Sequence, residues 1–389
     1  MKITKTKLKQ IIKEEVVKLL IEQDEYDDYD DYDDEEELTY AQKIIRFLSS
    51  NDPDTFAQGV EIYSLVKDEI EVNAPTENDE IIAKLQVIDQ FALSDIQNVD
   101  FLSGLKEINI TEQIDLSSCK SLQNIDGLKG CASLAILRLY ECDSLENVNG
   151  LAGCTNLTEL DLYWCEKLQN VDGLQGLTNL TTLYLGGGTF TALQSLGALG
   201  VLKSLPNLTK LDLNRCTSLE NVDVLEGCTN LTTLDLSWCR SLQNVDGLKE
   251  CTNLTTLTLY ECKSLENVDG LKECTNLTSL DLRYCSSLEN VDGLKGCTNL
   301  TTLDLRFCES LQNVDGLEGC TNLTSLDLRY CRSLQNVDGL KGCTNLKSLD
   351  LYRCRSLPLG LQKLFESDNS STAHEKFMKA LNASKGNQP

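Results

Sequence analysis

The segment CTNLTTLDLSWCRSLQNVDGLKE, residues 228–250, decides the fold, because it recurs with small changes through most of the chain. Residues 297–319, CTNLTTLDLRFCESLQNVDGLEG, differ from it at only a few scattered positions. Self-similarity at a fixed short period indicates a repeat architecture, in which each unit buries its apolar side chains against its neighbours. The repeats therefore predict one elongated solenoid with a cap, rather than several globular domains.

Each repeat contains a strand pattern followed by a turn pattern. The pattern L-x-x-L-x-L predicts a short strand with leucines inward and the intervening residues on the outer face. In the following N-V-D-G-L, Asn and Asp are expected to bind local backbone groups, and Gly to adopt a positive φ. The asparagines expected to act structurally in this turn are Asn124, Asn147, Asn170, Asn221, Asn244, Asn267, Asn290, Asn313 and Asn336.

The combined pattern LxxLxLxxC resembles the leucine-rich repeat superfamily, specifically its cysteine-containing variants, over residues 96–357. This resemblance implies an α/β fold: a right-handed solenoid with a parallel sheet on its concave face. Too few residues remain in each repeat for a full α-helix, so the convex side is expected to be 3₁₀ or irregular. Similar repeats occur in plant immune receptors, F-box proteins, and bacterial and protist surface or effector proteins, which implies binding through the concave face.

The eighteen cysteines occupy two registers of the repeat and are predicted to be buried, unpaired thiols. The first register holds Cys119, Cys142, Cys165, Cys216, Cys239, Cys262, Cys285, Cys308, Cys331 and Cys354. The second holds Cys131, Cys154, Cys228, Cys251, Cys274, Cys297, Cys320 and Cys343. A coil spacing of about 4.8 Å also permits disulfides, but these would pair coils two by two and break a uniform stack.

The remaining segments divide the chain further. We expect an amphipathic helix over 1–23, an acidic disordered linker over 24–37, a helical N-terminal cap over 38–95, and a C-terminal cap and tail over 358–389. Within the N-terminal cap, the third helix is predicted over 78–91. After Leu185 the leucine spacing lengthens from 23 to 28 residues, which predicts a bulged convex loop.

Charge and composition exclude several classes of function. The net charge is −26, and residues 24–37 hold eleven acids and no base, so a nucleic-acid partner is not expected. No apolar run is long enough to span a membrane, and lysines interrupt the opening segment where a secretory signal would be apolar. A cytoplasmic protein is therefore predicted. The recurring NLT tripeptides are interpreted as turn chemistry rather than glycosylation sites.

The sequence offers no constellation for catalysis or for a cofactor. Its only histidine, His374, lies in the C-terminal tail, and no C-x-x-C pair occurs, so neither a zinc site nor a nucleophile with its base is expected. No phosphate-binding loop or serine-hydrolase motif is present. We therefore predict a protein that is not an enzyme and needs no metal or cofactor.

The outward strand positions give a candidate binding surface. An aspartate column is expected at the middle strand position, where stacked carboxylates repel one another. Arg283, Arg306 and Arg329 lie two residues further on the same face and can neutralise the last coils, whereas Asp161, Asp212 and Asp235 lack such a neighbour. The predicted contact residues are Asp161, Tyr163, Trp164, Asp212, Asp235, Trp238, Tyr260, Asp281, Arg283, Tyr284, Asp304, Arg306, Phe307, Asp327, Arg329, Tyr330 and Tyr352.

Aromatic and arginine side chains dominate binding hot spots. We therefore predict a scaffold that binds a protein or peptide carrying basic and apolar groups, with a second partner open to the N-terminal helix, which could instead fold back on the cap. Two alternatives remain: a regulatory subunit or effector that modulates a partner enzyme, such as a ligase adaptor or inhibitor, and an unrecognised hydrolase that uses residues of the tail.

Overall fold

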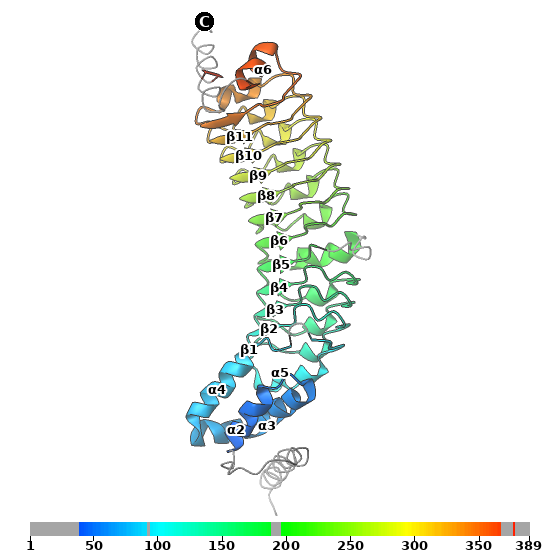
Figure 1. Ribbon diagram of the computed structural model, residues 1–389, viewed down its shortest axis with the longest axis vertical. Coiled ribbons are helices and arrows are strands. Elements are labelled where there is room, and N and C mark those ends of the chain that lie inside the picture. Colours follow the sequence, from blue (N-terminus) through cyan, green and yellow to red (C-terminus); the bar gives the residue numbers. More distant parts are fainter. Residues whose placement is uncertain (1–38, 92–93, 188–195, 367–375, 378–389) are drawn as a thin grey trace, which may run out of the picture.

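The protein forms a long, curved solenoid capped by helices at its N-terminal end (Figure 1). The computed structural model describes residues 39–91, 94–187, 196–366 and 376–377. The predicted amphipathic helix, the acidic linker, the loop after Gly187 and His374 lie outside these residues. Within them, no helix combines the length and apolar character needed to cross a membrane.

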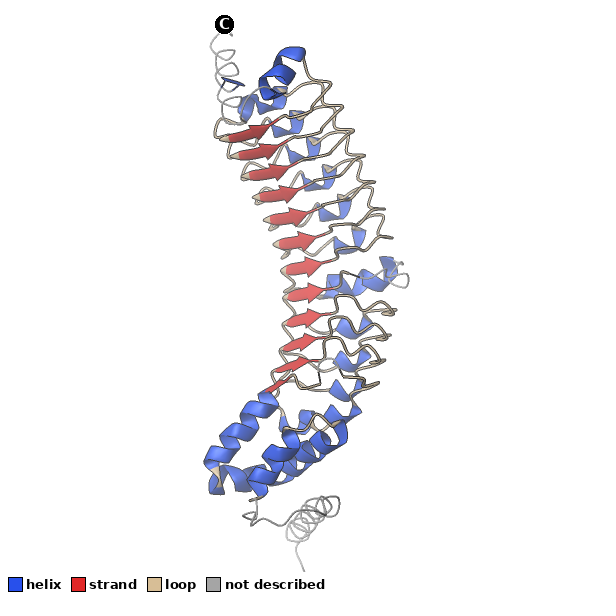
Figure 2. Ribbon diagram, viewed as in Figure 1, coloured by secondary structure: helices blue, strands red, loops and turns tan. Residues whose placement is uncertain are grey.

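Twelve short strands form one parallel sheet in chain order, along the inner side of the bend (Figure 2). Each strand pairs in register with the next, so that Leu280, Leu303 and Leu326 are aligned. The predicted solenoid with a parallel concave sheet is confirmed. The strands are β1 Val87–Ile88, β2 Gln113–Asp115, β3 Ile136–Arg138, β4 Glu159–Asp161, β5 Thr182–Tyr184, β6 Lys210–Asp212, β7 Thr233–Asp235, β8 Thr256–Thr258, β9 Ser279–Asp281, β10 Thr302–Asp304, β11 Ser325–Asp327 and β12 Ser348–Asp350.

The convex side consists of short 3₁₀ turns, as predicted. Most of them start at the aspartate of the V-D-G-L sequence, where an asparagine Oδ1 two residues earlier accepts a hydrogen bond from the aspartate N–H, as in Asn267 and Asp269 at 3.1 Å. This bond confirms the structural role predicted for the asparagines. The turns are Asp100–Leu102, Asp126–Leu128, Asn149–Leu151, Asp172–Leu174, Leu196–Ser204, Asp223–Leu225, Asp246–Leu248, Asp269–Leu271, Asp292–Leu294, Asp315–Leu317 and Asp338–Gly342.

The glycine of V-D-G-L serves close packing, so the predicted positive φ is wrong at this position. A Cβ atom on Gly270 would lie 2.0 Å from the carbonyl oxygen of Val245 in the preceding coil. Equivalent glycines from Gly127 to Gly339 meet the preceding coil at 1.9–2.1 Å. Val224 takes this place only in the coil that follows the longer 3₁₀ helix Leu196–Ser204. Glycine here lets neighbouring backbones approach closely.

Three helices form the described part of the N-terminal cap: α2 Tyr40–Leu48, α3 Pro53–Asn73 and α4 Pro75–Gln86. Thr39 caps α2 through a capping box with Gln42, and proline occupies the first turn of both α3 and α4. The third helix therefore starts and ends earlier than predicted. The chain then enters β1, which pairs with β2 and gives the sheet an extra strand.

Two further helices accompany the array. The single-turn helix α5 Leu105–Ile108 lies before β2, and α6 Leu359–Glu366 follows the last coil. Phe365 of α6 is buried and packs edge-on against Phe377, with ring centroids 6.3 Å apart. An apolar segment therefore covers the end of the solenoid, as the sequence suggests. The division of the chain at residues 38, 95 and 357 stays a prediction.

The cysteines line the interior as free thiols, and all but the half-buried Cys216 are fully buried. Thiols of both registers donate to backbone carbonyl oxygens of the preceding coil: the Sγ atom of Cys331 lies 3.1 Å from the oxygen of Leu305, and that of Cys297 lies 3.5 Å from Leu271. Burial raises the pKa of the Cys274 thiol to about 11. The thiols therefore act as small core residues that also satisfy neighbouring carbonyl groups.

We predict that Gly270→Ala destabilises the solenoid by about 1–3 kcal/mol, because the new methyl group forces two coils apart. Thermal unfolding monitored by circular dichroism measures the effect. Gly200→Ala is the matched control, since nothing lies within 4 Å of a Cβ atom at that position. An equal loss of stability in both variants would contradict the role assigned to the close contact.

We also predict that the thiols resist alkylation by iodoacetamide at pH 8 while the protein is folded. Burial disfavours the thiolate, which is the reactive form, and blocks access to the sulfur atoms. Mass spectrometry should find little label on the native protein and all eighteen cysteines labelled after unfolding in guanidinium chloride. Rapid labelling of many buried cysteines in the folded state would show that the coils open readily.

Candidate functional site

Three outward columns follow the carboxyl ends of the strands and form the candidate site. The aspartate column is the last residue of each strand, rather than its middle residue as predicted. The bridging column lies two residues later and the left-handed column three residues later. In the β9 coil these positions are Asp281, Arg283 and Tyr284.

Each aspartate has a structural task that the sequence analysis missed. Its Oδ1 atom accepts a hydrogen bond from the backbone N–H of the bridging residue, as between Asp235 and Ser237 at 2.8 Å. The same bond occurs from Asp115 to Asp350 wherever the column holds aspartate. It stabilises the turn at the end of the strand, because the side chain satisfies a local backbone donor.

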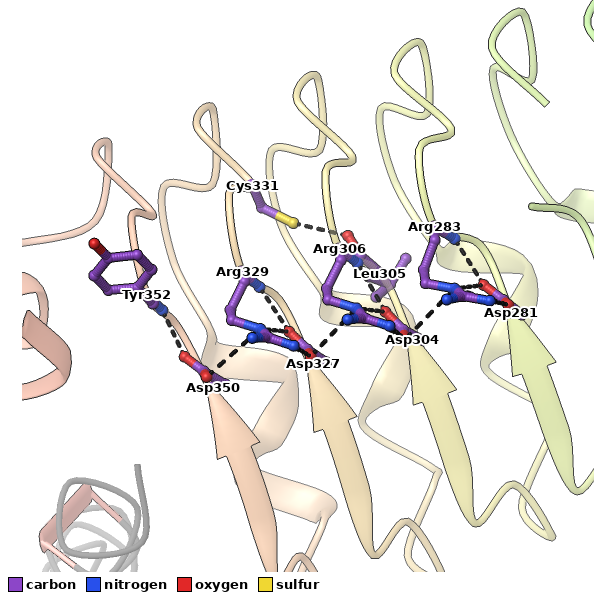
Figure 3. Close-up of polar contacts among 10 residues, drawn as sticks. All are labelled: Asp281, Arg283, Asp304, Leu305, Arg306, Asp327, Arg329, Cys331, Asp350 and Tyr352. Atoms are coloured by element: carbon purple, nitrogen blue, oxygen red, sulfur yellow. Dashed lines mark hydrogen bonds and ion pairs between the residues drawn. The ribbon is translucent and has the colours of Figure 1, made fainter. Parts of the chain in front are cut away.

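In the last coils the aspartate and bridging columns form a continuous ion-pair network (Figure 3). Arg306 binds Asp304 of its own coil through Nη2 at 2.7 Å and reaches Asp327 of the next coil through Nε at 3.4 Å. Arg283 and Arg329 repeat the arrangement. These contacts raise the pKa of Arg306 and confirm that the arginines can neutralise the carboxylates.

The middle coils lack this neutralisation. Asp212 and Asp235 are direct neighbours in the sheet, and their bridging residues are Asn214 and Ser237. Within the described residues, neither carboxylate forms an ion pair. Burial, with a smaller contribution from Asp235, raises the pKa of Asp212 to about 6, and burial also raises the pKa of Asp161. These carboxylates are therefore desolvated without a compensating cation.

The left-handed column has an unusual backbone conformation in every coil from β2 to β12. Its ten non-glycine members have φ between 57° and 64°. Such values are rare for bulky residues, yet this column carries Trp164, Trp238, Tyr284, Phe307 and Tyr330. Gly187 holds the same register in the β5 coil, with φ at 91°.

The aromatic side chains form two runs of touching rings. One joins Tyr140, Tyr163 and Trp164. The longer run extends from Trp238 to Tyr352, and in its centre Phe307 stacks between two tyrosines with centroid distances of 4.4 Å on either side. Tyr260 and Tyr352 belong to the bridging column, so the prediction that they share the register of Trp238 is wrong. They nevertheless continue the same run.

Several cations of this face were missed by the sequence analysis. Arg215 lies over the rings of both Trp164 and Trp238, at 5.7 and 5.3 Å from their centroids, and Arg240 lies 4.8 Å from that of Trp238. Their signal in the sequence was the position itself, because Arg215 occupies the register of the tryptophans. The surface is therefore aromatic and cationic at its edge, and acidic along the strands.

A polar groove of about 920 Å³ follows the other edge of the sheet, where the NLT tripeptides lie. Its asparagines and threonines bind the preceding coil: Asn253 Nδ2 donates to the carbonyl oxygen of Thr229 at 3.0 Å, and Thr255 Oγ1 to that of Thr232 at 2.9 Å. These bonds confirm the interpretation of NLT as turn chemistry. The groove contains none of the predicted contact residues.

The described residues hold no group of three or more histidine, cysteine, aspartate or glutamate side chains arranged for a metal ion. The three columns bring the predicted contact residues together from the β4 coil to the β12 coil. Their chemistry is that of a contact surface: half-buried rings, one neutralised stretch and one stretch of unpaired carboxylates. Whether this surface binds a partner is taken up below.

Comparison with protein families places this architecture. Residues 169–290 match a family described as disease resistance protein RPS4B-like leucine-rich repeats, and residues 87–184 match a BspA-type leucine-rich repeat region. Two further leucine-rich repeat families match residues 275–319 and 319–341. The chain belongs to the leucine-rich repeat superfamily, and its repeats are of a cysteine-containing kind.

Solved structures agree with this fold. An internalin, InlF from Listeria monocytogenes, is 17% identical with a TM-score of 0.51, covering 80% of this chain and 96% of its own. Internalin C2 from the same organism is 25% identical with a TM-score of 0.43, covering 54% and 84%. The functional domain of InlJ, also from L. monocytogenes and including a cysteine ladder, is 23% identical with a TM-score of 0.39, covering 70% and 68%. No curated protein matches the chain in sequence.

We predict that Asp212→Asn stabilises the fold by about 1 kcal/mol at pH 7.5 and less at pH 4.5. The folded carboxyl group, which faces Asp235, Asp161 and Lys210, keeps its proton up to about pH 6. Its contribution to stability therefore falls as the pH rises from about 4 to about 6. Asparagine avoids this loss and can still accept the N–H of Asn214.

Thermal melts at both pH values test this prediction. Asp327→Asn is the matched control, because it removes a charge that Arg306 and Arg329 bind. This control should lose about 0.5–1 kcal/mol at pH 7.5. If both substitutions shift the melting temperature in the same direction, the distinction between neutralised and unneutralised aspartates is wrong.

Proposed function

We propose that this protein is a non-enzymatic interaction scaffold that binds a protein or peptide through its concave face. The proposed contact surface is the set of outward columns at the strand ends, from the β4 coil to the β12 coil. Leucine-rich repeat proteins are typically binding scaffolds rather than enzymes, which agrees with this assignment. The particular surface is argued from this chain alone.

The left-handed column carries the proposal. Glycine, or failing that asparagine, fits a positive φ most easily, whereas other residues held there cost of order 1–3 kcal/mol each. The chain nevertheless places Trp164, Trp238, Tyr284, Phe307 and Tyr330 in this conformation. Repeated strain of this kind is typical of sites at which side chains are held for contact with another molecule.

Stacking among the rings does not by itself explain this choice. A stacked aromatic pair contributes about 0.5–1.5 kcal/mol beyond its buried area, which is no more than the conformational cost of one bulky residue with positive φ. Asparagine or glycine would close the same turn with less strain. Half-buried rings with exposed edges, beside arginines, match the composition of binding hot spots.

The chemistry of the surface favours a partner with basic and apolar groups. The aromatic run from Trp238 to Tyr352 offers apolar area, and Asp161, Asp212 and Asp235 offer carboxylates without a bound cation. Electrostatic complementarity with a basic partner would raise the association rate and select against acidic partners. The proposed compartment is the cytoplasm, where free thiols stay reduced.

We predict that the double variant Trp238→Ala, Tyr260→Ala weakens partner capture at least tenfold, because these rings are in contact and open the longer run. The measurement is chemical crosslinking in cells followed by affinity purification, with each recovered partner then titrated against the purified full chain. Circular dichroism verifies that the variant remains folded.

A convex variant provides the control. Lys272→Ala removes an exposed side chain that pairs only with Asp269 of its own turn, at 3.3 Å. This change should leave both stability and partner capture unchanged. Equal binding by the aromatic double variant and the wild type would refute the concave face as the contact surface.

A further inference from the structure

We infer that Asp212, Asp235 and Asn214 form a receptor for one arginine side chain of the bound partner. The inference rests on the proposed function and specifies the point on the concave face at which the partner places its charge. Its evidence is an internal comparison between coils of the same solenoid, together with an unsatisfied polar atom at the site.

The last coils show how this fold binds a guanidinium group. Arg306 lies between two successive aspartates and donates to both carboxylate oxygens of Asp304, while its Nε atom also faces Asp327. The aspartates occupy equivalent positions in sheet-paired strands. A guanidinium group between successive aspartates is therefore a geometry that the repeat already accommodates three times, at Arg283, Arg306 and Arg329.

Asp212 and Asp235 present the same pair of carboxylates without the arginine. They are register partners in β6 and β7, as Asp304 and Asp327 are in β10 and β11. Each uses Oδ1 to accept a backbone N–H at 2.8 Å, as the aspartates of the last coils do. The Oδ2 atoms, which bind Nη2 in the last coils, have no hydrogen bond in the described part of the chain.

Asn214 stands where an arginine stands in the last coils, and its side chain is too short to reach both carboxylates. Its Oδ1 atom is buried and has no hydrogen-bond partner among the described residues. An unpaired buried acceptor costs about 1–3 kcal/mol, which a donor supplied by a partner would recover. Three acceptors without donors thus converge on one position of the bridging column.

The cations nearest to this position already have other partners. Lys210 donates from Nζ to the hydroxyl oxygen of Tyr184 at 2.9 Å and lies over the same ring. Arg215 lies over the indoles of Trp164 and Trp238 and forms no ion pair within the described residues. Neither cation therefore takes the place that Arg306 takes between its aspartates.

Arginine fits this arrangement better than lysine. A planar guanidinium group offers five donors in a fixed geometry, which can bind two carboxylates and an amide oxygen together, whereas an ammonium group has three donors on one atom. The surrounding rings of Tyr163, Trp164 and Trp238 favour a weakly hydrated, flat cation. We therefore assign the receptor to an arginine on a protein or peptide.

The two tryptophans of the chain, Trp164 and Trp238, both lie beside the site and report on its occupancy. The test titrates N-acetyl-arginine amide into the full chain and follows tryptophan fluorescence, with the neutral isostere N-acetyl-citrulline amide as the comparison. We expect a saturable change with millimolar affinity for the arginine probe and at least tenfold weaker binding of the citrulline probe. Equal responses to both probes would overturn the inference.

Two variants give the test a specific signature. Asn214→Arg should supply the guanidinium group internally, so that the arginine probe no longer changes the fluorescence and the melting temperature rises. Asp235→Asn should weaken probe binding about tenfold without unfolding the chain, because asparagine can still accept the N–H of Ser237. An unchanged titration in both variants would place the probe elsewhere and overturn the inference.

The outcome is independent of the test of the proposed function. Loss of partner capture in the aromatic double variant, combined with no specific response to the arginine probe, would retain the scaffold and remove the receptor. A specific arginine response without any effect of the aromatic variant would retain the receptor and remove the aromatic contact surface.

Discussion

The whole molecule depends on the in-register pairing of each coil with the coil before it. Because parallel strands lie about 4.8 Å apart, every side chain meets the equivalent side chains of the two neighbouring coils. The glycine of the convex turn sets this spacing on the far side, where the backbones of successive coils touch. A residue type therefore appears as a column, and a column is stable only if its members tolerate one another.

Most columns of this chain satisfy that condition internally. Leucines and cysteines pack, thiols and threonine hydroxyls donate to carbonyl oxygens of the coil before, and asparagines cap turns. The arginines of the last coils alternate with aspartates. The columns that fail the condition are the more informative ones: bulky rings in a strained backbone conformation, and neighbouring carboxylates without a cation. Their strain is relieved only by contact with something outside the chain.

The sequence predicts the periodic features well, since a 23-residue period determines which side chains share a column. The inward leucines, both cysteine registers and the pairing of Arg283, Arg306 and Arg329 with aspartates follow from spacing alone. Features that depend on backbone geometry do not. The close contact at Gly270, the positive φ at Trp238 and the stacking of Arg215 on two indoles all require coordinates. Likewise, β1 was missed because its two residues pair with β2 without sharing the repeat motif.

The longer coil links this geometry to the candidate receptor. Between β5 and β6 the spacing grows by five residues, and the bridging and left-handed positions become Gly186 and Gly187. A Cβ atom on Gly187 would lie 2.4 Å from the ring of Trp164, and one on Gly186 would lie 2.8 Å from Asp212 Oδ1. The glycines thus make room for these two groups, and the ring and the carboxylate occupy the space of the missing side chains. The irregular coil therefore interrupts the columns directly beside Asp212, where the carboxylates are left without a cation.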